Sequence, residues 1–168
     1  ARGIRDDVTV VLLGTSLEGP AAQAIAAGAN EVLLVEHDLL NNRGTDAWVV
    51  AIEQVCRRTL PTIVLLGKSA LSRDVGPRVA FRLGVGLAQD CVEIGLDAST
   101  GRAIVRRPVY GGNAVATATF SEGDPQFIIL RAKIYEPLEP DPTREGKIVP
   151  FAVNLDPSTI RVKHIEIV

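Results

Sequence analysis

The sequence predicts an α/β protein with a doubly wound, mostly parallel sheet that carries an antiparallel flank. Three apolar runs, at residues 8–13, 31–35 and 62–66, have the composition of strands buried on both faces. A helical segment follows each run, and this alternation is typical of a parallel sheet joined by crossover helices. After residue 90 the pattern changes to short strands separated by turns, which predicts the antiparallel flank.

The three predicted helices depend on different signals. Residues 20–27 are rich in alanine and begin with a proline, which suits the first turn of a helix. The second helix begins at a Thr45 or Asp46 cap and places its apolar residues on one face before Pro61 closes the segment. Residues 74–83 form the third predicted helix, which the following glycine ends.

Four further strands are predicted in the second half of the sequence, at residues 91–96, 103–109, 114–120 and 126–131. Segments rich in Gly, Ser, Asp and Pro separate them, as expected for tight turns. Residues 136–142 contain three prolines, so we expect a surface linker there and no strand of the sheet core.

The composition excludes several classes of protein. A chain of 168 residues with 46% hydrophobic and 23% charged residues is globular, and its net charge of −2 argues against a nucleic-acid-binding surface. No apolar run reaches the ~18 residues that a membrane helix needs, and no secretory signal is visible. Cys56 and Cys91 make no disulfide framework and no zinc motif, so we expect a cytoplasmic protein without a metal site.

A nucleotide site is one possibility for the loop at residues 66–69. The sequence Leu-Gly-Lys-Ser resembles the end of a phosphate-binding P-loop, but Thr62 stands where that motif needs its first glycine. We also expect the next helix to begin near Asp74 and not at Ser69. The loop nevertheless follows a parallel strand, where open α/β sheets bind ligands, so an ordinary turn and a nucleotide site both remain open.

No catalytic constellation is apparent in the sequence. Gly84 and Gly86 begin like a dinucleotide fingerprint, but they follow a predicted helix and not a strand. His37 and His164 are far apart, and no Ser or Cys has a nucleophile-elbow context. We therefore predict that the chain is not an enzyme.

Residues 106–114 are the most distinctive stretch. Pro108 within a strand pattern indicates a sheet edge or a bulge, and Gly111, Gly112 and Asn113 form a tight turn. One interpretation is a hairpin corner with Tyr110 packed locally. The other is an exposed corner that contacts a partner chain, because glycine permits close approach of the backbone.

Two long motifs give the sequence a family resemblance. Residues 72–90 and 107–114, in this order and spacing, resemble the alpha subunit of electron-transfer flavoproteins. The strand at residues 62–67, the proline-rich segment at 136–142 and residues 156–168 also resemble that family's N-terminal domain and its exit.

The resemblance implies an adenine-nucleotide-hydrolase-like (Rossmann-like) fold. It implies an N-terminal domain over residues 1–135 and an exit segment over residues 136–168, leading toward an FAD-binding domain. The family also has a strand and a helix upstream of Val8, so we expect the natural polypeptide to extend beyond both ends. The FAD site is expected after Val168, with no cofactor held by this segment alone.

The resemblance further implies a heterodimer with a beta subunit. Such heterodimers carry FAD and take electrons from flavin dehydrogenases, for example those acting on acyl-CoA, in the cytoplasm of prokaryotes or the mitochondrial matrix. The residues expected at the beta-subunit face are Arg107, Tyr110, Gly111, Gly112 and Asn113. The alternative is a stand-alone adenine-nucleotide-binding module of the same fold, which would use Gly14 and the loop at residues 67–69.

Overall fold

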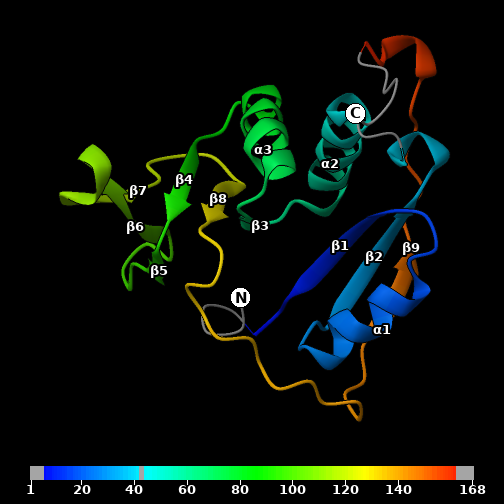
Figure 1. Cartoon of the computed structure of the whole chain (residues 1–168), viewed down its shortest axis with the longest axis horizontal. Coiled ribbons are helices and arrows are strands. Elements are labelled where there is room, and N and C mark those ends of the chain that lie inside the picture. The colour runs from blue at the N-terminus through cyan, green and yellow to red at the C-terminus, as the bar shows by residue number, and fades with distance from the viewer. Residues whose placement is uncertain (1–5, 42–43, 162–168) are drawn as a thin grey trace. The chain divides into compact units, whose positions relative to one another are not determined.

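The computed structural model describes residues 6–41 and 44–161. The chain divides into two compact units, the first formed by residues 1–51 with 137–168 and the second by residues 52–136 (Figure 1). Helix α2 (Thr45–Thr59) contains the boundary between them. The predicted fold class is confirmed, with parallel sheets and a small antiparallel sheet.

The first unit is a three-stranded parallel sheet with one helix on it. Its strands are β1 (Thr9–Gly14), β2 (Glu31–Glu36) and β9 (Lys147–Pro150), in the order β1-β2-β9. Helix α1 (Glu18–Ala26) packs on β1 and β2. The alanines and branched side chains of this contact form a buried cluster: Ala21, Ile25, Ala29 and Val32.

Strand β9 was not predicted from the sequence. It lies in the segment expected to be an exit linker, and it pairs with β2 from Glu31↔Lys147 to Leu34↔Pro150. All four residues of β9 are exposed, so it lacks the buried apolar character by which the other parallel strands were recognised.

The second unit contains a parallel sheet in the order β3-β8-β4. Its strands are β3 (Ile63–Gly67), β8 (Gln126–Leu130) and β4 (Leu87–Cys91), and helix α3 (Ala70–Leu83) packs on all three. The central strand β8 supplies the largest fully buried side chains of this unit, which include Phe127, Ile128 and Ile129.

The antiparallel sheet of the second unit has the order β5-β6-β7. Its strands are β5 (Glu93–Leu96), β6 (Ala103–Val109) and β7 (Ala114–Thr119). Strand β6 also contacts β4, and the two sheets share a buried cluster of small and branched residues: Ala88, Cys91, Ala103, Val105 and Ile128.

The structure corrects the expected start of the third helix. Helix α3 begins at Ala70, four residues before Asp74, and Ser69 is its N-cap. The Ser69 hydroxyl accepts from the Ser72 N–H at 3.0 Å, and the Ser72 hydroxyl accepts from the Ser69 N–H at 2.8 Å. This reciprocal capping box uses a serine where the usual pattern has Glu or Gln, which is why the sequence signal was missed.

The structure also corrects the strand predicted at residues 91–96. That segment belongs to two different sheets, because β4 ends at Cys91 and β5 begins at Glu93. Strand β4 is parallel to β8, whereas β5 is antiparallel to β6. The polar residues in the middle of β4, Gln89 and Asp90, interrupt the apolar run that marks a buried strand.

Candidate functional site

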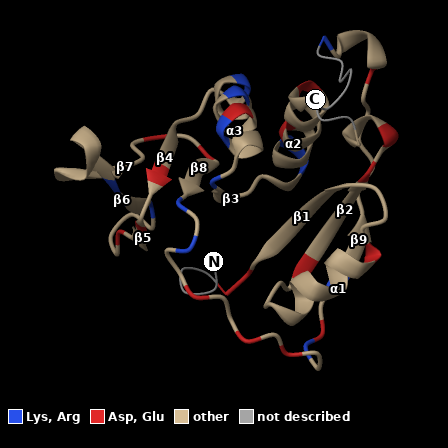
Figure 2. Ribbon diagram, viewed as in Figure 1, with Lys and Arg blue, Asp and Glu red and all other residues tan. Residues whose placement is uncertain are grey.

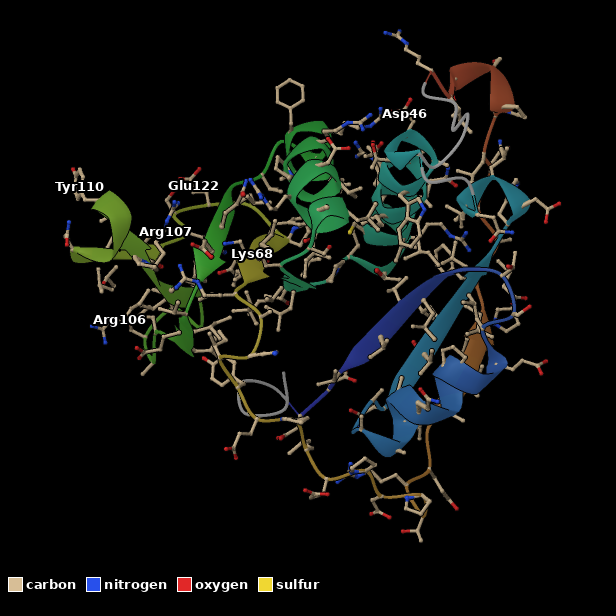
Figure 3. The ribbon with its side chains drawn as sticks, in the orientation of Figure 1. Asp46, Lys68, Arg106, Arg107, Tyr110 and Glu122 are labelled. Atoms are coloured by element: carbon tan, nitrogen blue, oxygen red, sulfur yellow. The ribbon has the colours of Figure 1, made fainter. Side chains whose placement is uncertain are left out.

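The predicted beta-subunit face lies at the tip of the β6–β7 hairpin. Tyr110, Gly111 and Gly112 form a 3₁₀ turn, and the Asn113 N–H donates to the Tyr110 carbonyl at 3.3 Å. Tyr110 is 84% exposed, so it does not pack locally, and it lies at the outer end of the hairpin (Figure 3). Tyr110, Gly111 and Gly112 all have positive φ, at 52°, 68° and 97°, which explains the two glycines.

Strand β7 continues this surface along the hairpin. It pairs with β6 from Val109↔Ala114 to Ile104↔Thr119 and is the edge of its sheet. Every residue of β7 except Ala116 is exposed, and its sequence, Ala-Val-Ala-Thr-Ala-Thr, contains no charge. An edge strand of this kind presents unpaired backbone N–H and C=O groups without the charged side chains that usually prevent association.

Arg107, the remaining residue predicted at the interface, lies on β6 and is half-buried. Its Nε atom is buried and has no hydrogen-bond partner among the described residues. The neighbouring Arg106 is different, because its guanidinium pairs with Glu93 across the sheet at 3.0 Å and both side chains are more than half exposed. The pairing of β5 with β6 stops at Arg106, so Pro108 has no β5 residue opposite it. At Pro108 the β5 side of β6 is therefore a sheet edge, as the proline predicted.

A second cluster, which the sequence did not reveal, is formed by Lys68, Asp90 and Arg131. The Lys68 Nζ donates to Asp90 Oδ1 at 2.6 Å, and Arg131 donates from Nε to Oδ1 at 3.0 Å and from Nη2 to Oδ2 at 2.7 Å. Hydrogen bonds from Arg131 and Lys68 hold the pKa of Asp90 far below its usual range. We call these three residues the Asp90 cluster.

The backbone positions the Asp90 cluster at one edge of the parallel sheet. Lys68 follows β3, Arg131 follows β8, and Asp90 lies one residue before the end of β4. Basic and acidic segments are both present around β3, β4 and β8 (Figure 2). Asp90 has a φ of 60°, and the β4–β8 register shifts between Ala88 and Cys91 at this point. Asp adopts this left-handed conformation more readily than most residues. Asp90, directly before the strand predicted at residues 91–96, was therefore the sequence feature that could have indicated a distorted strand here.

The residues of the alternative nucleotide site lie in different units. Gly14 ends β1 in the first unit, and the loop at residues 67–69 belongs to the second. Beyond Gly14 is an open cavity of about 430 Å³ lined by the exposed or half-buried side chains of Thr15, Ser16, Glu36, His37 and Asp38. The His37 Nδ1 accepts from the Leu39 N–H at 3.1 Å, and Glu36 accepts from the Leu17 N–H at 3.2 Å.

The glycine turn before β4 does not fit a dinucleotide. Gly84 and Gly86 lie between the end of α3 and the start of β4, whereas a pyrophosphate turn connects the end of a strand to a helix. A Cβ added at Gly86 would contact the Phe120 ring at 3.6 Å, so side chains already fill the space beside this glycine. This turn therefore provides no cradle for a pyrophosphate.

No nucleophile or metal centre emerges from the described residues. Cys56 and Cys91 are free and buried, and burial raises the pKa of the Cys56 thiol to about 11. Residues 6–41 and 44–161 contain no group of three His, Cys, Asp or Glu side chains that could hold a metal ion. Within the same ranges no helix combines the length and apolar character needed to cross a membrane. His164 lies outside the described residues.

Comparison with known proteins identifies the family. Residues 1–156 match the electron transfer flavoprotein domain. The chain is 33% identical over 161 residues to electron transfer flavoprotein subunit alpha of Thermoanaerobacterium thermosaccharolyticum, covering 96% of this chain and 48% of the relative. It is 32% identical over 164 residues to the corresponding subunit of Clostridium acetobutylicum, covering 96% and 49%.

A third relative is Protein FixB of Clostridium saccharobutylicum, 34% identical over 161 residues, which cover 96% of this chain and 48% of that protein. The chain thus spans about half the length of these relatives. The resemblance inferred from residues 72–90 and 107–114 is confirmed, and the chain belongs to the electron transfer flavoprotein family as an alpha-subunit-like domain.

Proposed function

We propose that this chain is the N-terminal domain of an electron-transfer flavoprotein alpha subunit and that its β6–β7 hairpin docks the beta subunit. Residues 1–135 form the main part of the proposed domain, strand β9 adds to its first sheet, and residues 136–168 lead toward an FAD-binding domain that follows. The chain is a scaffold and not a catalyst. The assembled heterodimer carries electrons on FAD from flavin dehydrogenases, such as acyl-CoA dehydrogenases, to an acceptor in the cytoplasm or the mitochondrial matrix.

The observation that carries this proposal is the combination of an exposed tyrosine and an uncharged edge strand on one hairpin. Tyr110 is 84% exposed at the tip, and Val115 on β7 is 51% exposed. Tyrosine is enriched at protein interfaces, where its ring fills a pocket and its hydroxyl finds a partner. The free edge of β7 offers backbone hydrogen bonds to an extended segment of the partner.

In this proposal FAD is bound in the assembled heterodimer and is not held by the residues of this chain alone. The turn containing Gly84 and Gly86 does not fit its pyrophosphate, as described above. The described residues therefore serve to bind the beta subunit and to hold the following domain in position.

The test compares heterodimer affinity with the stability of the alpha subunit. In the full-length alpha subunit, Gly111→Val with Gly112→Val introduces β-branched residues at positive φ, where valine is strained. We expect the double variant to weaken binding of the purified beta subunit by about tenfold or more, because interface anchors cost about 2 kcal/mol when lost. The free energy of unfolding should fall by less than the binding free energy, because the strain is confined to an exposed turn.

Tyr110→Ala separates side-chain contact from backbone strain. We expect a similar loss of affinity in calorimetry, with an unchanged melting temperature. The matched control is Phe81→Ala on α3, because Phe81 is an equally exposed aromatic residue, at 86%, outside the hairpin. Unchanged affinity in Tyr110→Ala, or equal losses in Tyr110→Ala and Phe81→Ala, would refute docking through the hairpin.

A further inference from the structure

The Asp90 cluster has more positive than negative charge. Lys68 and Arg131 both pair with the single carboxylate of Asp90. Arg107 lies two residues after Val105 on β6, on the face of the strand whose buried residues pack against Cys91, the residue that follows Asp90. The Asp90 cluster alone has a net charge of +1, and Arg107 brings the net charge of these four residues to +2.

The position of the cluster suits a ligand. Strands β3, β4 and β8 are parallel neighbours, so their carboxyl ends lie at one edge of the sheet. Lys68, Asp90 and Arg131 lie at or just beyond those ends. Open α/β sheets bind ligands in this place, and helix α3 begins two residues after Lys68 with its positive dipole end toward this edge.

The cationic side chains retain hydrogen-bonding capacity. Lys68 has three N–H donors and uses one on Asp90, and Arg131 has five and uses two there. Both side chains remain accessible, with 36% and 42% of their surface exposed. The buried Nε of Arg107 has no acceptor among the described residues, which is unfavourable for a guanidinium unless an anion supplies one.

We propose that Lys68, Arg107 and Arg131 form a binding site for the phosphate group of a small phosphorylated molecule. A phosphate dianion matches the local net charge of +2 and offers the acceptor oxygens that guanidinium forks bind in pairs. The Asp90 carboxylate competes with the phosphate for Lys68 and Arg131, but one negative charge does not neutralise both. Apart from Arg107, which lies on β6, the site is outside the β6–β7 hairpin, and the proposal holds whether or not the hairpin tip docks a beta subunit.

The first experiment is a titration of the ¹⁵N-labelled protein with inorganic phosphate, AMP and adenosine, followed by NMR. We expect phosphate and AMP to shift the amide signals of residues 67–70, 90 and 131, and adenosine to leave them unchanged. Raising the salt concentration should weaken the effect, because the attraction is between charges. AMP binding tighter than inorganic phosphate would identify a nucleotide as the source of the group, and equal affinities would identify free phosphate.

The second experiment uses variants that remove one charge at a time. Lys68→Met and Arg131→Met should each lower phosphate affinity by about tenfold or more, since a hydrogen bond to a charged group is lost. Arg106→Met is the matched control, because Arg106 is an exposed arginine of the same unit that pairs with Glu93. Melting temperatures would establish that each variant is folded.

Asp90→Asn gives the sharpest test, because it removes the competing negative charge and keeps the side-chain shape. We expect the unsubstituted protein to bind phosphate and Asp90→Asn to bind it more tightly, whereas a purely structural ion triad would show no phosphate binding in the unsubstituted protein. The proposal would be overturned if phosphate shifted no signal at the cluster, if adenosine bound as well as AMP, or if Arg106→Met lost as much affinity as Lys68→Met.

Discussion

Strands β8 and β7 lie in the same unit and have opposite environments. Strand β8 (Gln126–Leu130) is buried along its length except at Leu130, whereas β7 (Ala114–Thr119) is exposed except at Ala116. Both are apolar enough to be predicted as strands from the sequence. The difference arises from pairing and cover: β8 has a neighbour on each side and packs against α3, whereas β7 is paired on one side.

Strands of similar composition therefore serve different purposes in this unit. Strand β8 contributes to stability through the apolar surface that it removes from water. Strand β7 leaves much of its apolar surface and one backbone edge in solvent, so its contribution to stability is small and its capacity for binding is large. The two properties can be tested separately.

The largest expected effect is on the core strand. Phe127 is fully buried, so Phe127→Ala should lower the free energy of unfolding by about 3–5 kcal/mol through lost burial and the cavity left behind. Val115→Ala on β7 should change it by about 0.5 kcal/mol or less, because Val115 is half exposed. Denaturant unfolding of both variants measures the contrast. Equal losses would show that β7 is as important to stability as β8.

A smaller effect is expected at the start of α3, the helix that covers β8. Ser69→Ala removes the hydroxyl that accepts the Ser72 N–H, and should lower the free energy of unfolding by about 1 kcal/mol. Ser69→Asp restores an acceptor at the N-cap and should recover most of this loss in the same thermal or denaturant measurement. Full stability in Ser69→Ala would mean that the capping box is unimportant.

The smallest effect concerns acid stability at the edge of the same sheet. The pKa of Asp90 is lower in the folded protein than in the unfolded chain, where it is about 3.9. Its ionised form therefore stabilises the protein above about pH 4, and this contribution is lost as the pH falls toward the folded pKa. Asp90→Asn should flatten the fall in stability below about pH 4 in pH-dependent unfolding.

Some acid dependence should remain in Asp90→Asn. Hydrogen bonds from Ser99 and Thr100 lower the pKa of Asp97 to about 2, and this residue lies on the antiparallel sheet's first turn. If the variant and the unsubstituted protein lost stability identically between pH 4 and pH 2, the Asp90 cluster would contribute nothing to folding.

The sequence predicted the strands that are apolar and the turns that are rich in glycine and aspartate. It also placed Tyr110, Gly111, Gly112 and Asn113 at one turn, because they are contiguous. It did not predict β9, because all residues of that strand are exposed. It also did not separate β4 from β5, because Val92 continues the apolar pattern between them. The Asp90 cluster was missed because its members are up to 63 residues apart and charged residues in loops usually face solvent.

The amino-acid sequence by itself therefore determined the fold class, the family and the hairpin with two glycines, since these depend on local composition and contiguous motifs. Only the tertiary structure decided which strands share a sheet, that β7 is an exposed edge, and that Lys68, Asp90 and Arg131 meet. The physical reason is that strand pairing in parallel sheets joins segments distant along the chain. The carboxyl ends of such strands meet at one edge, where their charges act together.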